Sequence, residues 1–133
     1  AEDIKIKVGS AVPLKDELDV EVNGRDVITG LPKTVRIESE EIRRALNKPL
    51  DEMAKAVKDA LDATPPDLAS DLMYYGILLT GGGALLSNLD QVLRNATGLP
   101  VSIAENPLAC VVKGTGKALD EIRKLKGILS TMY

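Results

Sequence analysis

Three consecutive glycines between an apolar run and a helical pattern constrain this chain more than any other feature. Residues 80–84 read Thr-Gly-Gly-Gly-Ala, follow the apolar run 77–79 and precede an amphipathic pattern that begins at Leu85. This order predicts a strand, a tight turn and a helix. Because glycine has no Cβ, the backbone of such a turn can approach a flat ligand closely. The amides at the start of the following helix are free to bind a polar ligand, so the turn is a candidate nucleotide site.

Two known glycine motifs do not fit this turn. The dinucleotide fingerprint needs a glycine or alanine three positions after its second glycine, and counting from Gly83 that position holds Leu86. The P-loop needs a lysine and a hydroxyl residue after its glycines, whereas the chain continues Ala84-Leu85-Leu86. Glycine content alone leaves two interpretations open, contact with a nucleotide and a purely structural connection between strand and helix.

The composition excludes several classes of function. The chain has 133 residues, 44% hydrophobic and 28% charged, which is an ordinary composition for about one globular domain. It has no histidine, so neither imidazole zinc ligands nor a Ser-His or Cys-His catalytic pair exists within it. The net charge of −3 argues against nucleic acid as the main partner. Cys110 is the single cysteine, and its apolar neighbours predict a buried, inert thiol.

The first part of the chain predicts a small β-unit. Residues 1–9 alternate between apolar and charged side chains, which favours a half-exposed strand, with a short helix as the competing interpretation. Residues 18–37 predict a three-stranded meander whose first turn is a type I′ turn at Asn23-Gly24.

Two helices are expected next. Ser39 is expected to cap a long amphipathic helix over residues 39–61, which Pro49 should kink or split. Thr64 is expected to cap a second helix, with proline in its first turn, that ends at Gly76. The side chains expected on its buried face are Leu68, Leu72 and Tyr75.

A strand–helix–strand unit is expected around the glycine turn. The strands cover residues 77–80 and 101–103, and the helix begins at Leu85 and ends at Gly98. A crossover of this length predicts parallel strands.

A final helix is expected after Asn106-Pro107. Gly114 and Gly116 inside it weaken the helix by about 1 kcal/mol each relative to alanine, and we expect them to permit close approach of a neighbouring backbone. From Arg123 onward, basic and apolar residues alternate, which predicts a frayed amphipathic tail.

The order of several unrelated segments resembles one protein family. Residues 71–90, DLMYYGILLTGGGALLSNLD, resemble the adenosine-binding segment of the actin, sugar kinase and DnaK-type chaperone superfamily. The match is closer to the MreB family, the bacterial actins that shape rod cells. The segments that occur in the order found there are VGSAVPLKDE, VNGRDVITGLPKTVRIESEEIRRAL, TPPDLASDL, GILLTGGGALLSNLD and TGLPVSIAENPLACVVKGTGKALDEI. The resemblance covers about residues 1–125 and implies the C-terminal portion of a longer protein.

For the fold, the resemblance implies an α/β (α+β) fragment, half of an actin/DnaK/sugar-kinase-type ATPase fold. Residues 1–62 would form a unit like subdomain IIB, with a nucleotide-facing helix, the β-meander and the long helix. Residues 63–133 would form the C-terminal part of subdomain IIA, a β-α-β-α unit that carries the glycine turn. The family's phosphate-binding hairpins, magnesium-linked aspartate and hydrolytic acidic residue would precede Ala1. The resemblance therefore implies that this piece alone has no catalytic or metal-binding residue and is inactive as an ATPase.

For the site, the resemblance places adenosine between two segments. The matching turn residues are Gly81, Gly82, Gly83 and Ala84. The opening residues resemble the helix on the other side of the adenine and ribose, so we predict a helix rather than a strand over residues 1–9. Glu2 can accept hydrogen bonds from ribose hydroxyls, and Lys5 can lie over the base or its polar edge. Spacing alone favours a solvated charge pair for these two residues. Asp3 departs from the family, in which arginine is frequent at this position.

For function, the resemblance implies an ATP-binding, filament-forming protein that determines rod shape by organising cell-wall synthesis. The implied cofactor is ATP or ADP, with Mg in the full-length protein. The implied partners are other subunits of a homopolymer and a RodZ-like membrane anchor on IIA, with no nucleic acid. The implied location is cytoplasmic, in filaments at the inner face of the cell membrane, with membrane contact through N-terminal elements outside this chain. Two alternatives are the ATP-binding lobe of a superfamily kinase and a non-catalytic interaction module.

Overall fold

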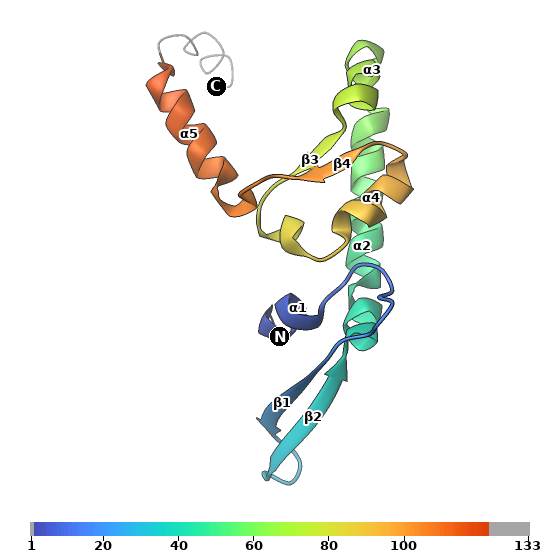
Figure 1. Cartoon of the computed structure of the whole chain (residues 1–133), viewed down its shortest axis with the longest axis vertical. Coiled ribbons are helices and arrows are strands. Elements are labelled where there is room, and N and C mark those ends of the chain that lie inside the picture. The colour runs from blue at the N-terminus through green and yellow to red at the C-terminus, as the bar shows by residue number, and fades with distance from the viewer. Residues whose placement is uncertain (1, 123–133) are drawn as a thin grey trace.

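The computed structural model describes residues 2–122, which form helices and two small, separate sheets (Figure 1). The elements, in chain order, are α1 (Glu2–Val8), β1 (Asp19–Arg25), β2 (Pro32–Glu38), α2 (Ser39–Asp62), α3 (Pro66–Tyr75), β3 (Ile77–Leu79), the 3-10 turn η1 (Gly82–Leu85), α4 (Leu89–Thr97), β4 (Val101–Ile103), the 3-10 turn η2 (Pro107–Ala109) and α5 (Cys110–Asp120). The opening helix predicted from the resemblance is present as α1. The mixture of helices and strands agrees with the expected α/β fragment.

The long helix α2 connects the lower and upper parts of the molecule in Figure 1. It runs for 24 residues through Pro49, so of the two expected effects of the proline, a kink or a split, the split is wrong. Leu50, the next residue, is buried in the core, and this packing holds the helix together across the missing backbone hydrogen bond. Glu38 rather than Ser39 occupies the cap position, where its N–H donates to Glu41 Oε2 over 3.2 Å.

The β-unit is a two-stranded hairpin, so the predicted three-stranded meander is wrong. β1 pairs with β2 in antiparallel register, and Asn23 and Gly24 lie inside this ladder, opposite Thr34 and Lys33. The predicted type I′ turn at Asn23-Gly24 is therefore also wrong.

An aspartate sets the actual turn of the hairpin. The Asp26 carboxylate accepts hydrogen bonds from the N–H groups of Ile28 over 2.9 Å and Thr29 over 3.0 Å. Gly30 closes the turn with a φ of 71°, a conformation that favours glycine. The N–H donors of Thr29 and Ile28 hold the pKa of Asp26 below its ordinary value. Because this side chain supplies its own local hydrogen bonds, the turn forms three residues later than the Asn-Gly pair suggested.

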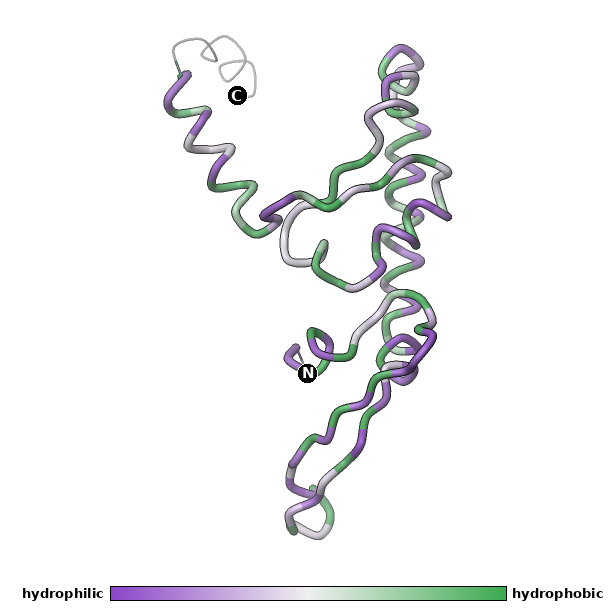
Figure 2. The backbone as a smooth tube through the Cα atoms, viewed as in Figure 1, coloured by the Kyte–Doolittle hydropathy of each residue, from purple (hydrophilic) through white to green (hydrophobic). Residues whose placement is uncertain are grey.

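The core lies where α2 crosses α4 and the second sheet. β3 and β4 pair in parallel, with Ile77 opposite Val101, as the crossover predicted. In Figure 2, β3 is hydrophobic along its whole length. The buried core residues are Ala11, Leu50, Leu89, Leu93 and Val101.

The helix after the glycine turn begins later than predicted. The glycines lead into η1, and α4 starts at Leu89 rather than at Leu85. Asn88, the residue before α4, has φ 64° and ψ 18°, and this left-handed residue separates the two helical segments. Gly98 ends α4 as predicted, again in the left-handed region.

For α3, the extent of the helix was predicted more accurately than its buried face. Pro66 occupies the first turn and Gly76 ends the helix, as predicted. The cap residue is Pro65, because the Thr64 hydroxyl donates back to the Ala60 carbonyl of α2 over 2.8 Å. The face expected to be buried is not covered by residues 2–122: Leu68 and Tyr75 are exposed and Leu72 is half-buried.

Helix α5 projects away from the core (Figure 1). Cys110 is half-buried rather than buried, and its Sγ donates to the Asn106 carbonyl over 3.2 Å. A Cβ added at Gly114 or Gly116 would meet no heavy atom of the described chain within 4 Å, so the predicted close approach is wrong for residues 2–122. The tail predicted from Arg123 onward lies outside the described residues.

Candidate nucleotide site

The glycine turn is anchored on one side. The Gly81 N–H donates to the Pro107 carbonyl over 2.9 Å, and the Gly81 carbonyl accepts from the Ala84 N–H over 3.2 Å. Gly81 has a φ of 78°, which a residue with a Cβ rarely adopts. Ala84 is buried and fixes the end of the turn in the fold. The turn is therefore held in place by its backbone and by Ala84.

The other side of the turn is open. A Cβ built on Gly81 or Gly83 would meet no heavy atom within 4 Å. At Gly82 the first neighbour would be Leu108 Cδ2, at an ordinary contact distance of 3.5 Å. The backbone of Gly81 and Gly83 is therefore open to a ligand on this side, and the missing Cβ atoms let a planar group approach it closely.

The two predicted residues of α1 are exposed and one helical turn apart. Among residues 2–122, neither Glu2 nor Lys5 forms an ion pair, so both side chains are available to a ligand. Asp3 and Lys7 lie elsewhere on the helix, because they line a hollow of about 290 Å³ against β1. Asp3 thus differs from Glu2 and Lys5 in its surroundings.

The structure brings α1 and the glycine turn together through their C-terminal ends. Ser10, two residues after α1, forms a parallel β-bridge with Ser87, just after η1. A Cβ on Gly9 would lie 3.4 Å from Leu86 Cδ1. In Figure 1, η1 is the short yellow turn that precedes α4. No hydrogen bond or ion pair within residues 2–122 joins the side chains of Glu2 and Lys5 to the turn.

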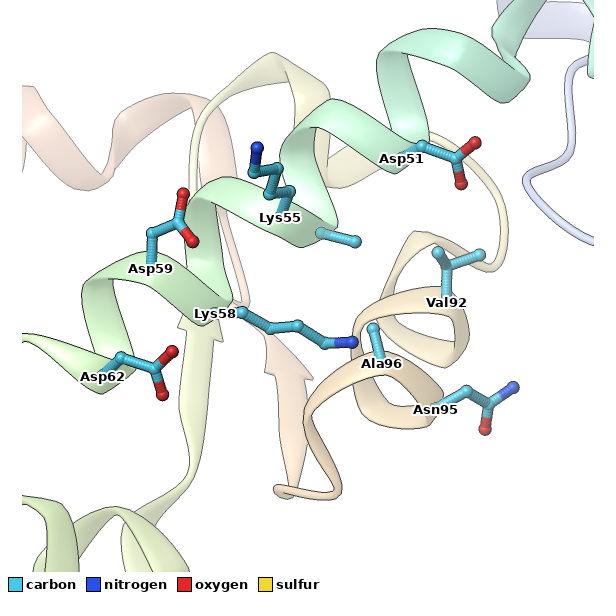
Figure 3. A pocket seen from close by; sticks show the side chains of 9 residues that line it. Asp51, Lys55, Lys58, Asp59, Asp62, Val92, Asn95 and Ala96 are labelled. Carbon is cyan, nitrogen blue, oxygen red and sulfur yellow. The ribbon is translucent and has the colours of Figure 1, made fainter.

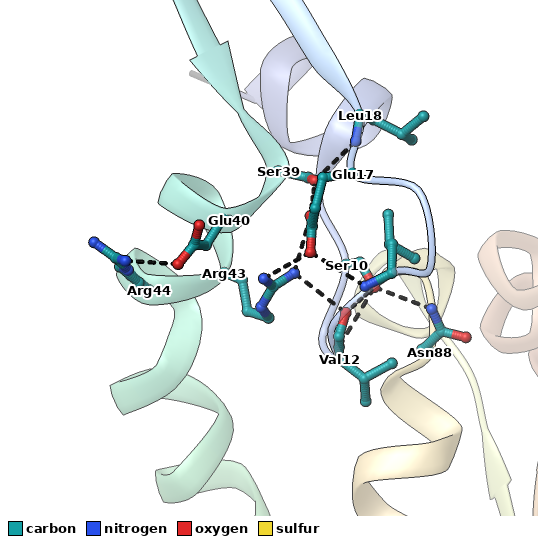
Figure 4. Close-up of polar contacts among 10 residues, drawn as sticks. Ser10, Val12, Glu17, Leu18, Ser39, Glu40, Arg43, Arg44 and Asn88 are labelled. Carbon is teal, nitrogen blue, oxygen red and sulfur yellow. Dashed lines mark hydrogen bonds and ion pairs between the residues drawn. The ribbon is translucent and has the colours of Figure 1, made fainter.

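Sequence reasoning missed two residues at this junction, Ser10 and Asn88. The Asn88 side-chain amide donates to Ser10 Oγ over 3.0 Å (Figure 4). A usable signal was present, since asparagine directly before an amphipathic run is a preferred helix-cap residue and tolerates the left-handed conformation.

A second polar cluster ties the connector between α1 and β1 to the start of α2. Arg43 of α2 binds the Glu17 carboxylate with both guanidinium Nη atoms, at 2.8 Å and 3.2 Å. The Ser39 hydroxyl donates to the same carboxylate and accepts the Leu18 N–H over 3.0 Å (Figure 4). The hydrogen bonds from Arg43 and then from Ser39 lower the pKa of Glu17 from 4.5 to about 2.

A larger hollow lies apart from the glycine turn, between α2 and α4 (Figure 3). Its volume is about 650 Å³, and it has an apolar floor that includes Val92 and Ala96. Lysine and aspartate side chains of α2 surround it, with Lys58 extending toward α4. None of the predicted site residues lines this hollow between α2 and α4.

Two further classes of site were tested on the described part of the chain. Within residues 2–122, there is no group of three or more cysteine, aspartate or glutamate side chains that could hold a metal ion. The helices of the same residues are all too short or too polar to cross a bilayer.

Solved structures with the same fold define the class of protein. The chain matches MreB5 of Spiroplasma citri bound to ADP with a TM-score of 0.85 and 41% identity, over 92% of this chain and 37% of that protein. The same protein bound to AMPPNP matches with a TM-score of 0.83, at the same identity and coverage. The chain is therefore a portion of an actin-like fold.

The sequence comparisons show the family. Residues 1–127 match the MreB/Mbl protein family, and the chain belongs to it. It is 44% identical over 125 residues to the cell shape-determining protein Mbl of Bacillus subtilis, covering 94% of this chain and 38% of that protein. It is 49% identical over 122 residues to the cell shape-determining protein MreB of Escherichia coli, covering 92% of this chain and 35% of that protein. The chain thus spans little more than a third of these relatives.

Proposed function

We propose that this chain supplies the adenosine side of the nucleotide cleft in an ATP-binding, filament-forming, actin-like protein that determines cell shape by organising cell-wall synthesis. The observation that carries the proposal is the open glycine turn, whose accessible side no described side chain fills. The two MreB5 structures, one with ADP and one with AMPPNP, support an adenine nucleotide as the ligand.

In this proposal the chain's residues share the adenosine between them. The purine lies against the backbone of Gly81–Ala84, where the missing Cβ atoms leave room for a flat ring. The Glu2 carboxylate accepts hydrogen bonds from the ribose hydroxyls, and the Lys5 ammonium lies over the base or binds its polar edge. Residues 1–62 then belong to subdomain IIB and residues 63–133 to subdomain IIA. The nucleotide's phosphates and Mg are held by residues outside this chain.

The proposal extends to partners and location. Other subunits of a homopolymer are the main partners, because the hairpin tip carries two apolar side chains, Val27 and Ile28, that are 97% and 92% exposed. A RodZ-like membrane anchor binds subdomain IIA, and the filaments lie in the cytoplasm at the inner face of the cell membrane. Membership of the family supports these parts of the proposal.

A binding titration with the full-length protein that carries these residues tests the adenosine site. Lys5→Ala is expected to weaken ADP binding about five- to twentyfold, as loss of one charge-assisted or cation–π contact does. Lys7→Ala is the matched control, because Lys7 lies on the same helix but lines the hollow against β1. Equal effects of the two substitutions, or none from either, would contradict the proposed site.

A substitution in the turn tests the same site from the opposite wall. Gly83→Leu places a side chain in the open space, where the described chain offers no clash within 4 Å of the new Cβ. We expect ADP binding to be lost while the ligand-free unfolding temperature changes little. Unchanged ADP affinity in a folded Gly83→Leu protein would show that the purine lies elsewhere.

A further inference from the structure

One side-chain hydrogen bond joins the end of α1 to the end of the glycine turn. Asn88 Nδ2 donates to Ser10 Oγ over 3.0 Å, although the two residues are 78 positions apart in the sequence. Beside this bond, the Ala11 N–H donates to the Ser87 carbonyl over 2.8 Å (Figure 4 shows Ser10 and Asn88). Both bonds lie where the chain has just left α1 and, later in the sequence, where it has just left η1.

The Ser10 hydroxyl is committed to this junction. Its side chain is fully buried, at 0% exposure, and its Oγ donates to the Val12 carbonyl over 2.8 Å while it accepts from Asn88. A buried polar group that loses its partner costs more than an exposed one, because water cannot replace the lost bond. The bond is therefore a stronger constraint on geometry than an equivalent bond at the surface.

The backbone of Asn88 is constrained as well. Within residues 2–122 it is the single non-glycine residue with a positive φ, 64°. This conformation turns the chain from η1 into α4, and asparagine tolerates it better than most residues. Asn88 thus combines an unusual backbone conformation with a long-range side-chain bond, a pairing typical of positions that the surrounding fold holds in one geometry.

We propose that the Ser10–Asn88 hydrogen bond is a tether that fixes the spacing between α1 and the glycine turn, which makes Asn88 a positioning residue for the adenine nucleotide. The inference rests on the proposed function, because it requires α1 and the turn to contact the same ligand. Two walls that contact one rigid ring system must be held within about 0.5 Å of their productive separation. The tether joins the chain just after α1 to the chain just after η1, and it sets the separation of α1 and the glycine turn without contacting the ligand.

Asn88→Gly tests the tether with little risk to folding, because glycine adopts the left-handed conformation easily and removes only the side-chain amide. In the full-length protein we expect ADP affinity to fall about three- to tenfold, the effect of losing one hydrogen bond. Ser10→Ala removes the same bond from the other partner and is expected to give a similar loss. Asn95→Gly, at an exposed position of α4, is the control for weakening of that helix alone.

A double-mutant cycle with Lys5→Ala separates positioning from general stability. If the tether acts by placing α1, Asn88→Gly has a smaller effect on ADP affinity once Lys5 has lost its contact, with the remaining effect due to Glu2. Non-additive losses, with Asn95→Gly close to the wild type, support the tether. Additive losses, or unchanged ADP affinity in Asn88→Gly, overturn the tether while the adenosine site stands. ADP binding that Lys5→Ala leaves unchanged overturns the proposed function and the tether with it.

Discussion

Glu17 shows how a residue without special sequence context becomes a fixed point of the structure. Its carboxylate binds both Nη atoms of Arg43 and accepts the Ser39 hydroxyl, so two residues of α2 and the connector before β1 meet at one charge. No local sequence pattern predicts this cluster, because Glu17 and Arg43 are 26 residues apart. The amphipathic pattern placed Arg43 on the polar face of α2, and the fold then gave that face a partner.

Stability should depend on the ionisation of Glu17. Its pKa is about 2 in the folded protein against an ordinary value of 4.5, so the carboxylate stabilises the fold fully above pH 4.5. This contribution is lost as the pH falls from 4.5 toward 2. We expect Glu17→Gln to lower the unfolding temperature at neutral pH, with a difference from the wild type that shrinks below pH 4.5. Thermal unfolding between pH 2 and 7 measures it, and a constant difference would contradict the role of the charge.

Gly76 is the glycine whose replacement should cost most. Its φ is 69°, and a Cβ there would lie 2.2 Å from the Pro100 carbonyl oxygen, a backbone atom that cannot move aside cheaply. We expect Gly76→Ala to destabilise the protein by about 2–4 kcal/mol, from strain and displacement of the β3–β4 junction. Gly24→Ala is the control, since a Cβ at Gly24 meets nothing within 4 Å and should change stability by less than about 0.5 kcal/mol. Denaturant unfolding of both variants decides the prediction.

At the scale of elements, periodicity predicted α2 better than it predicted where α2 and α4 begin. The apolar stripe of α2 and the parallel β3–β4 pair were predicted correctly. The starts of α2 and α4 were wrong because side chains distant in sequence changed the local choice. The Ser39 hydroxyl hydrogen-bonds to Leu18 and Glu17 instead of capping the helix. The Asn88 side chain hydrogen-bonds to Ser10. Such contacts depend on the fold and are invisible to a local pattern.

Leu50 should account for much of the attachment of α2 to the core. Its side chain is only 4% exposed and lies in the cluster with Leu89 and Leu93 of α4. Leu50→Ala is expected to destabilise the protein by about 2–5 kcal/mol, through lost burial and the cavity that remains. Met53→Ala, one turn later on α2 and 45% exposed, should cost less than half as much. Equal costs in chemical denaturation would show that the core is not centred on Leu50.

At the scale of the molecule, the family could be predicted and the surroundings of several helices could not. The order of segments identified the family. The adenosine site at the glycine turn stays a prediction. An amphipathic pattern shows which face of a helix is apolar but not what covers that face. Tyr75 of α3 and Val111 of α5 illustrate this limit of pattern reasoning, since both are exposed among residues 2–122.

The hairpin tip offers a test of polymer contacts. Val27 and Ile28 are almost fully exposed, so replacing them with lysine should leave folding intact. If these side chains are buried between subunits, the double substitution Val27→Lys/Ile28→Lys should reduce ATP-dependent pelleting of the full-length protein several-fold, because two buried charges oppose association. Thr34→Lys, on the same hairpin away from the tip, is the control. Wild-type pelleting by the tip variant would exclude the tip from the contact.

The continuity of α2 has a mechanical consequence. β2 ends at Glu38 and α2 begins at the very next residue, so no loop separates the strand from the helix. The helix is about 36 Å long, and its middle, around Leu50, lies in the core with α4. We therefore expect a displacement of the hairpin to move α2 as one body rather than to be absorbed at a hinge between them.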